Sequence, residues 1–416
     1  MNILHISNTD LVGGRFTGYY MQQLLDKSYN VEMAVWNRTT QSSHVQQMPP
    51  SNPVLRFFAT ITMKVGGKIG FDGLTGSSGW VLPTREYFKQ ADVVHLHLIH
   101  NNANISVLSL PLLSRQKPVV WTIHDPWAMT GGCLHSFECD RWLTGCAPRC
   151  PHPGRRSLFK HYGPYLHWRI KKLVYHRADM TLIVASQWMQ DRIERSPLLR
   201  HLPCHRIPFG IDLEVFKPRS KIECRKKLGL ASDHKVIAFR DVGLDSDRFK
   251  GMRWLMAALK IYKPQEPTCL LIFEDGKGFK NLSPKYSVTT PGWVDGEDLG
   301  VALSAADVFL MPSIQEAFGL MAVEAMACGT PVIVFEGTSL PEVIRSPRGG
   351  LAVPAMDSVA LAGAIKRLLD DDDLRSELGG QARQIAEREY AFPLYVQRHI
   401  SLYEEVIERQ RYRDRG

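Results

Sequence analysis

The sequence predicts an α/β protein built from two doubly wound domains. A chain of 416 residues, 44% of them hydrophobic, has room for two ordinary cores. Short apolar, strand-like segments alternate with helix-like segments, and this alternation runs through two series separated by a proline-containing seam at residues 203–218. We therefore expect an N-terminal domain over residues 1–206 and a C-terminal domain over residues 207–392, each with a Rossmann-like parallel sheet.

The predicted elements follow one another in the order that such sheets require. The first series has strands expected at residues 2–7, 29–36, 92–98, 119–123 and 181–185, with helices at 18–27 and 165–176. The second series is expected to begin near residue 205 and to continue with strands at 235–239, 268–274, 306–312 and 331–335 and helices at 252–259, 297–305 and 318–328. Ligands of doubly wound sheets bind beyond the carboxyl ends of the strands, so functional side chains are expected in the loops that follow them.

Composition excludes several other classes of protein. No segment reaches the roughly 18 apolar residues of a transmembrane helix, and the first residues lack the basic and apolar regions of a secretory signal, so we expect a cytoplasmic protein. Eight cysteines are too few and too unevenly spaced for a secreted disulfide scaffold. The net charge of +9 is not accompanied by a recognised nucleic-acid module, so we expect no nucleic acid as a partner.

The segment 315–334 carries the clearest functional signal. Glu316 lies between a predicted strand and a predicted helix, and Glu324 follows further along that helix. Gly319 permits a close backbone approach to a ligand, and the free amides of the first helical turn favour a diphosphate. Carboxylates accept paired hydrogen bonds from the vicinal hydroxyls of a ribose or a hexose. The grouping indicates a sugar-nucleotide site, with two surface glutamates on an amphipathic helix as the alternative.

This segment resembles the Glu-x7-Glu signature of retaining, nucleotide-sugar-dependent glycosyltransferases of family four. Further matching motifs follow in the family's order over nearly the whole chain: Gly13-Gly14, Thr122-Ile123-His124-Asp125, Ile207-Pro208-Phe209-Gly210-Ile211-Asp212, Lys250-Gly251 and Pro291-Gly292-Trp293-Val294. The resemblance implies the GT-B fold, in which two Rossmann-like domains face each other across a cleft. It also implies a C-terminal helix, here within residues 393–416, that crosses back to the N-terminal, acceptor-binding domain, while residues 207–392 bind the donor.

The resemblance implies a role for each matched residue. His124 and Glu316 would lie by the transferred sugar, in a reaction that proceeds on one face of the sugar and requires stabilisation of charge. Glu324 would hold the nucleotide ribose and Lys250 the diphosphate. Further donor contacts are expected from Gly13, Gly14, Arg248, Trp293, Val294, Phe318, Gly319 and Leu320, where Trp293 either stacks on the base or packs in the core.

One departure from the family pattern bears on the donor site. The family usually has an arginine after the glycine that corresponds to Gly243, where this chain has Leu244. Arg248 or Arg240 can supply the guanidinium, or Lys250 and helix amides hold the diphosphate alone. A binding protein with a degenerate donor site and a GT-B epimerase or hydrolase therefore stay as alternatives. A NAD-dependent dehydrogenase is disfavoured, because the first glycine loop does not read Gly-x-Gly-x-x-Gly.

Half of the cysteines cluster within 18 residues shortly after His124. They are Cys133, Cys139, Cys146 and Cys150. Such a cluster favours a structural zinc held by four thiolates, but the spacing lacks the Cys-x2-Cys pairs of common zinc modules, so disulfides and unligated thiols are alternatives. A similar insert occurs in a subgroup of the family that acts in bacterial surface polysaccharide assembly, such as that of lipopolysaccharide O-antigen or capsule. No cofactor is expected for catalysis.

Two basic segments indicate contact with a membrane surface. Residues 155–177 contain seven Lys or Arg, no acidic residue and interleaved aromatic residues, and residues 54–71 mix three basic residues with apolar ones. Each basic residue near an anionic leaflet contributes roughly 1 kcal/mol of binding, although a solvated amphipathic helix is the alternative. We expect a peripheral enzyme on the inner face of the plasma membrane that transfers a hexose from a nucleotide diphosphate sugar, UDP being favoured over GDP, to a carbohydrate acceptor such as a polyprenyl-linked oligosaccharide.

Overall fold

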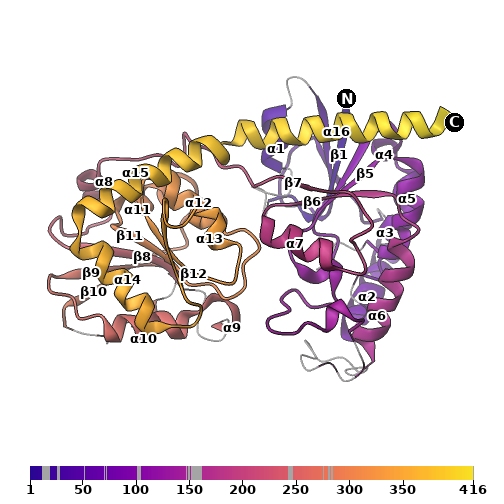
Figure 1. Cartoon of the computed structure of the whole chain (residues 1–416). Helices are drawn as coiled ribbons and strands as arrows, with labels where there is room; N and C mark the ends of the chain where they lie inside the picture. The colour runs from indigo at the N-terminus through magenta and orange to yellow at the C-terminus, as the bar shows by residue number, and fades with distance from the viewer. Residues whose placement is uncertain are drawn as a thin grey trace. The chain divides into compact units, whose positions relative to one another are not determined.

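The structure is a computed structural model that describes residues 1–11, 19–25, 29–50, 52–69, 71, 73–100, 105–146, 148, 150, 162–241, 247–274, 276–279, 282 and 284–415. The chain divides into two compact units: unit 1 comprises Met1–Ile207 and Val396–Gly416, and unit 2 comprises Pro208–Tyr395. Each unit has a parallel sheet flanked by helices (Figure 1). The predicted α/β class with two Rossmann-like sheets is confirmed.

The sheet of unit 1 has seven parallel strands in the order β3-β2-β1-β4-β5-β6-β7. They are β1 (Asn2–Thr9), β2 (Asn30–Asn37), β3 (Val45–Gln47), β4 (Val93–Leu96), β5 (Val119–Thr122), β6 (Met180–Val184) and β7 (Cys204–Arg206). Every residue of β4, β5 and β6 is buried, as expected for parallel strands that are covered on both faces. The prediction that the second series begins near residue 205 was wrong: His205 pairs with Ile183 of β6 and belongs to the first sheet.

Helices connect and cover the strands of unit 1. They are α1 (Tyr19–Leu25), α2 (Pro53–Ile69), α3 (Ser78–Val81), α4 (Glu86–Gln90), α5 (Leu110–Gln116), α6 (Gly163–Tyr175) and α7 (Gln187–Arg195), with 3₁₀ turns η1 (Leu82–Thr84), η2 (Val107–Ser109), η3 (Pro126–Met129) and η4 (Arg141–Leu143). Helix α2 exposes Val54, Leu55, Phe57, Phe58, Ile61 and Val65, whose exposed fractions range from 39% to 62%. Within the described ranges, no helix combines the length and apolar character that crossing a bilayer requires.

The last helix, α16 (Phe392–Arg415), completes unit 1. The hydroxyl of Tyr403 lies 2.6 Å from Nδ1 of His95 in β4, and Nη2 of Arg409 donates to Oγ1 of Thr181 in β6 at 2.9 Å. Figure 1 shows this helix in yellow along the sheet of unit 1. The predicted C-terminal helix that packs against the N-terminal domain is therefore confirmed.

The sheet of unit 2 has six parallel strands in the order β10-β9-β8-β11-β12-β13. They are β8 (Lys235–Asp241), β9 (Thr268–Glu274), β10 (Tyr286–Gly292), β11 (Val308–Met311), β12 (Val332–Phe335) and β13 (Gly350–Val353). After β8 the chain builds one half of the sheet through β9 and β10, then returns to place β11 on the other side of β8. The boundary between β8 and β11 is thus the topological switch point, where doubly wound sheets bind their ligands.

Helices cover both faces of this sheet. They are α8 (Lys221–Lys227), α9 (Asp247–Lys250), α10 (Met252–Ile261), α11 (Gly296–Ala305), α12 (Leu320–Ala327), α13 (Leu340–Val343), α14 (Ser358–Asp370) and α15 (Asp372–Glu389), and η6 (Lys277–Phe279) is a 3₁₀ turn. Alternate strand residues such as Ile237 and Phe239 pack with α10 and α14 in one core, which is the two-residue period of a strand with one face toward that layer. The remaining strand residues of β8 and β9 are mostly buried on the opposite face.

Candidate functional site

In unit 2, two oppositely charged side chains meet at the switch point. Lys250 ends α9, which follows β8, and Glu316 follows the neighbouring strand β11. Nζ of Lys250 lies 2.8 Å from Oε2 of Glu316, and the two side chains are 29% and 18% exposed. Because both side chains keep part of their surface exposed, a ligand can reach either one and replace the other member of the pair. The structure therefore brings together two predicted site residues that are 66 positions apart in the chain.

The backbone around Lys250 explains why the two loops approach each other. The N–H of Ile314 donates to the carbonyl of Phe249 at 2.8 Å, which joins the segment after β11 to α9. Gly251 has φ +74°, and a Cβ at this position would lie 2.0 Å from the carbonyl oxygen of Pro312. Only glycine accepts both the left-handed conformation and this close approach. The Lys-Gly pair therefore presents Lys250 to the Glu316 loop.

The start of α12 lies directly after Glu316. The carbonyl of Glu316 accepts hydrogen bonds from N and Oγ of Ser339, at 3.3 and 3.0 Å. Gly319 caps α12 with φ +91°, and a Cβ there would lie 2.2 Å from Cδ2 of Leu340, so the helix begins at Leu320 instead of the predicted residue 318. The first amides of this eight-residue helix are the ones that would face an anion. Glu324 lies in the same helix and is fully buried.

For two of the predicted donor contacts, Trp293 and Phe318, the structure shows whether the side chain is exposed or buried. Trp293 is 68% exposed, which rules out the interpretation that it packs in the core. The guanidinium of Arg240 lies 4.4 Å from its ring centroid and donates to the carbonyl of Val294 at 3.2 Å. Phe318, by contrast, is buried with its ring 5.1 Å from Phe209, so its side chain supports the loop and only its backbone is available to a ligand.

Some of the predicted contacts fall on residues that the structure does not describe. Gly13, Gly14 and Leu244 lie outside the described residues. Arg248 belongs to α9, but its side chain is not among those described. Arg240, the other candidate for the expected arginine, also has its Nε 3.7 Å from Oε1 of Glu274, so it is placed between an aromatic ring and a carboxylate. The assignment of these residues to the donor site stays a prediction.

In unit 1, His124 follows β5 and joins a buried group of histidines. Its Nε2 lies 3.4 Å from Nδ1 of His97, and Nε2 of His97 lies 2.9 Å from Nδ1 of His5. His5 of β1 is the register partner of His95 in β4, so these two side chains lie on the same face of the sheet. In the sequence, His95 and His97 stand at the end of a predicted strand, where they either line a cleft or pack the core, whereas His5 is not marked by any motif. The signal that could have found His5 is a histidine in the first strand followed by a His-x-His pair in a later one.

Burial makes this histidine group neutral. It lowers the pKa of His5 and of His124 to about 3, and it lowers the pKa values of His95 and His97 well below the ordinary value. His95 also has its Nε2 2.7 Å from Oγ1 of Thr122, in addition to its contact with α16. At neutral pH, His124 can therefore offer a sugar hydroxyl a directed hydrogen bond but no positive charge.

The residues after His124 form a rigid connection to α6. Asp125 accepts a hydrogen bond from the N–H of Trp127 at 2.8 Å and lies 3.0 Å from Nε2 of His100. Burial alone would raise the pKa of Asp125, but His100 and these hydrogen bonds lower it below the usual value. The Trp127 ring stacks on His100, with centroids 4.7 Å apart. The ammonium of Lys171 lies 3.4 Å from the centroid of the Trp127 ring.

Asp10 is a further polar residue that the sequence interpretation missed. It follows the buried part of β1, and its carboxylate accepts hydrogen bonds from the N–H and hydroxyl groups of Thr39 and Thr40 at 2.7–3.2 Å. Burial raises the pKa of this carboxyl, but the four donors outweigh burial and hold it well below its usual range. An acid placed directly after a strand was the available signal, and its role in the structure is to join the ends of β1 and β2.

The four clustered cysteines converge on one pocket. Cys133, Cys139, Cys146 and Cys150 line it together with Thr130, Ser136, Arg141, Trp142 and Pro164. All four thiols are free of disulfide bonds. A hydrogen bond with Cys150 raises the pKa of Cys133, and burial raises that of Cys146 to about 11. The N–H of Gly131 donates to Sγ of Cys146 at 3.3 Å.

The basic and aromatic segment before residue 177 is less available to a membrane than the sequence suggested. Residues 151–161 lie outside the described residues. In α6, Trp168, Lys171 and Tyr175 are buried, because the helix packs this face into unit 1. These three side chains therefore cannot contact a leaflet, while Leu166 and Leu173 are exposed.

Comparison with known proteins agrees with this fold and these motifs. Residues 69–215 match the family described as Glycosyltransferase Family 4, and residues 241–371 match the family described as Glycosyl transferases group 1. Each match covers about a third of the chain, and both families are described as glycosyltransferases, which agrees with the GT-B class of the fold.

The individual relatives have low sequence identity to this chain. The chain is 26% identical over 321 residues to the MMP alpha-(1->4)-mannosyltransferase of Mycolicibacterium hassiacum, covering 75% of this chain and 71% of that one. Sucrose-phosphate synthase from Thermosynechococcus elongatus has a similar structure, with a TM-score of 0.68 at 22% identity over 98% of this chain and 99% of that one. HepE of Anabaena in complex with UDP has a TM-score of 0.66 at 17% identity, over 97% and 99% of the two chains. The chain spans about half the length of several other curated relatives that it matches.

Proposed function

We propose that this protein is a retaining glycosyltransferase that moves a hexose from a nucleotide diphosphate sugar to a carbohydrate acceptor. The observation that carries the proposal is the Lys250–Glu316 pair at the switch point of unit 2, next to the first turn of α12. A diphosphate that bound there would meet an ammonium group and free helix amides, and Glu316 would be released toward the sugar. UDP is the favoured nucleotide, and the complex of HepE with UDP supports this choice.

Each unit has a separate part in this proposal. Unit 2 binds the donor: Lys250 and the start of α12 contact the diphosphate, Glu324 contacts the ribose, and Trp293 with Val294 contact the base. Unit 1 binds the acceptor and contributes His124 to the transferred sugar. Separation of the diphosphate from the sugar then needs stabilisation of the developing negative charge, which Lys250 provides.

The first test is saturation-transfer NMR of the full chain with UDP-, GDP- and ADP-sugars. We expect one nucleotide sugar to bind preferentially, and Lys250→Ala and Glu324→Ala to weaken that binding enough to lose the signal at the same ligand concentration. Lys260→Ala serves as the control, because this residue is an exposed lysine of α10 outside the site. Binding by the wild-type chain that survives both site variants would remove this site from the proposal.

Turnover assays separate transfer from the alternatives. Consumption of the bound donor only in the presence of a carbohydrate acceptor supports transfer. Consumption without any acceptor would instead show a GT-B epimerase or hydrolase. Binding of a donor with no turnover under any acceptor would show a binding protein, and the departure at Leu244 would be its natural explanation.

We propose in addition that the acceptor is a polyprenyl-linked oligosaccharide of surface polysaccharide synthesis and that the protein binds the inner face of the plasma membrane. Helix α2 supports this part of the proposal. Its six large exposed apolar side chains are accompanied by Arg56, Lys64 and Lys68 and by no acidic residue, a composition that suits an anionic leaflet.

Flotation with vesicles tests the membrane contact. We expect binding to vesicles that contain phosphatidylglycerol, weaker binding to phosphatidylcholine alone, and loss of binding in the Phe57→Asp/Phe58→Asp variant. Ile222→Asp is the matched control, since Ile222 is an exposed apolar residue on α8 of unit 2. Equal binding by the wild type and the double variant would exclude α2 as the contact.

A further inference from the structure

We infer that Cys133, Cys139, Cys146 and Cys150 bind one structural Zn²⁺ as four thiolates. The four side chains come from a segment whose regular structure is the single 3₁₀ turn η4, yet all of them line the same pocket. Zn²⁺ prefers four ligands in a tetrahedral shell, and a Cys₄ set is a common structural site. The inference does not depend on the proposed transferase activity.

The loop has too little apolar material to fold by burial alone. Among the described residues of 131–150, Trp142 is the only hydrophobic side chain that is buried. Turn hydrogen bonds hold part of the loop: N–H groups of Gly145 and Cys146 donate to the carbonyl of Arg141 at 2.9 and 2.8 Å. Such bonds fix single turns, so a cross-link between distant parts of the loop is what the segment needs.

The backbone at two positions shows that the loop is constrained. Phe137 has φ +48° and Cys146 has φ +45°, left-handed conformations that are unfavourable for residues other than glycine. Such conformations persist where the surroundings impose them. Metal bonds to the cysteines before and after these positions would impose them, because the ligand geometry fixes where each Sγ must lie.

A buried positive charge lies beside the pocket and would partly offset the negative charge of a four-thiolate zinc site. Binding of Zn²⁺ to four thiols releases four protons to the solvent and leaves a site with a net charge of −2. The ammonium of Lys171 is buried beside the loop, where it donates to the carbonyls of Trp127 and Thr130 at 2.5 and 3.1 Å. The N–H of Gly131 already donates to Sγ of Cys146, the type of hydrogen bond that supports metal-bound ligands.

The arrangement favours zinc over the two alternatives. Two disulfides would divide the four thiols into two separate pairs, whereas all four line a single pocket. Four unligated thiols would leave the loop without the cross-link that its small core requires. The loop follows Trp127, whose ring packs on His100 next to Asp125. Zinc would therefore also hold the segment after His124 in place.

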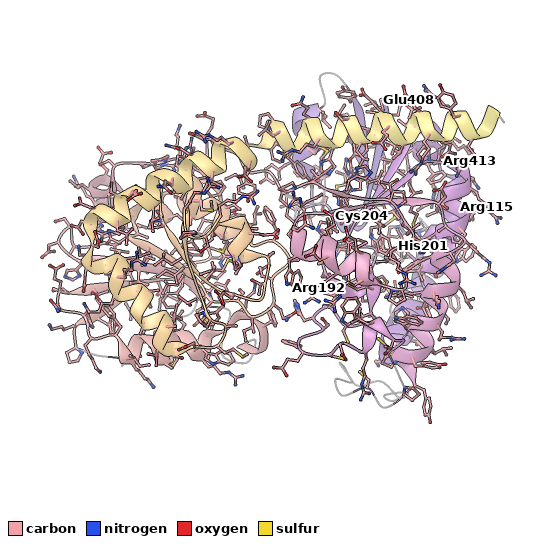
Figure 2. All side chains as sticks on the ribbon, in the orientation of Figure 1. Arg115, Arg192, His201, Cys204, Glu408 and Arg413 are labelled. Carbon is pink, nitrogen blue, oxygen red and sulfur yellow. The ribbon has the colours of Figure 1, made fainter. Side chains whose placement is uncertain are left out.

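Metal analysis of the full chain tests the inference. Protein purified with a phosphine reductant and without added metal is expected to contain about one zinc per chain by inductively coupled plasma mass spectrometry. Cys133→Ser and Cys146→Ser should lose the metal, whereas Cys204→Ser should retain it. Cys204 is the matched control because it is a partly buried cysteine of β7 outside the cluster (Figure 2).

Four outcomes would overturn the inference. One is zinc at the wild-type level in both cluster variants. The second is a metal-free wild type in which all eight thiols react after denaturation, which would show unligated cysteines. The third is a metal-free wild type with fewer reactive thiols, which would show disulfides, and iron in place of zinc would also contradict it.

A second measurement covers the case in which a cysteine variant does not fold. Wild-type protein is stripped with a chelator and then given Co²⁺, whose visible absorption distinguishes four thiolate ligands in a tetrahedral shell from other sets. Tryptic cleavage at Arg141 in the loop should accelerate on stripping and slow again on addition of Zn²⁺. No cobalt–thiolate absorption together with metal-independent cleavage would exclude the site.

Discussion

The two units contain different kinds of polar network. Unit 1 has a neutral one at the carboxyl ends of its strands, where His5, His97 and His124 contact one another. Unit 2 has charged ones: the Lys250–Glu316 pair at the carboxyl ends and, at the amino end of β11, the carboxylate of Asp307 with Lys221 and Arg225 at 2.8 and 2.7 Å. The same sheet architecture therefore supports two electrostatic environments.

This difference limits what each unit can contribute to the proposed reaction. A neutral, buried imidazole offers directed hydrogen bonds to sugar hydroxyls and does not attract a diphosphate. A partly exposed ammonium beside a helix start, such as that of Lys250, attracts a diphosphate. The contrast supports the proposal that unit 2 holds the donor nucleotide, while unit 1 contributes orientation at the sugar.

The largest expected effect is on the stability of unit 2. Asp307→Ala removes the carboxylate that pairs with buried Arg225 and accepts from the N–H of Val236 at 2.7 Å. Loss of one partner from a buried ion pair costs roughly 3–5 kcal/mol in the free energy of unfolding. Urea denaturation of the variant measures it.

The control for this prediction is Asp298→Ala. Asp298 pairs with Lys227 at 3.0 Å, but both side chains are well exposed, so the expected loss is about 0–1 kcal/mol. Equal losses in the two variants would contradict the claim that unit 2 depends on a buried charge network.

The next effect is on turnover. Glu316→Gln keeps the size of the side chain but removes the charge that faces Lys250. If the proposed transfer is correct, we expect turnover to fall on the order of 10²–10³-fold, the range for removal of one preorganised electrostatic contact, with a smaller change in donor affinity. Steady-state assays with Glu297→Gln, an exposed residue of α11, as the control measure this. Near-normal turnover would take Glu316 out of the reaction.

Donor affinity is expected to change less. Glu324→Ala should weaken nucleotide-sugar binding by about 1.5–3 kcal/mol, the range for hydrogen bonds to a charged group, or about 10- to 150-fold in Kd. Titration calorimetry measures it, and Glu324→Gln tests whether the charge or the shape of this buried side chain matters. His124→Ala, in unit 1, should leave the same affinity nearly unchanged, and the opposite pattern would reverse the proposed roles of the two units.

The sequence predicted the central strands of the sheets better than the edge strands. Continuous apolar runs such as residues 119–123 marked buried central strands because they are short and rich in β-branched residues. The short edge strand β7 was assigned to the wrong series, since three partly exposed residues carry no signal of which sheet they join. Its pairing is decided by the position of β6, a contact that local sequence does not specify.

The candidate site was predictable where backbone geometry restricts residue type. Gly319 and Gly251 have conformations and contacts that only glycine accepts, so their neighbours Glu316 and Lys250 could be placed from the sequence. The histidine group of unit 1 could not, because it depends on the register between β1 and β4. The exposure of Trp293 likewise depends on how Arg240 stacks on its ring, a contact between residues 53 positions apart.

The most selective effect is that of pH on the two units. His5 and His124 have pKa values of about 3 in the folded protein against an ordinary value of 6.5, so below about pH 6.5 the unfolded chain binds more protons. The stability that these groups contribute is complete above 6.5 and is lost as the pH falls toward 3, at up to ~1.4 kcal/mol per pH unit for each histidine. Unit 2 should respond differently. Burial raises the pKa of Asp307, but Lys221 and Arg225 outweigh burial and lower it below 3.8, so its contribution is lost only below that pH.

Tryptophan fluorescence can follow unit 1 alone. Seven of the nine tryptophans lie in unit 1, and Trp254→Phe/Trp293→Phe removes the two in unit 2. Urea denaturation of this variant should show a lower midpoint at about pH 5 than at about pH 7, whereas His97→Gln should reduce the difference and His234→Gln, in unit 2, should not. A midpoint that does not change between these pH values would mean that the buried histidines are not neutral in the folded protein. The contrast between the neutral histidine group of unit 1 and the charged networks of unit 2 would then have to be abandoned.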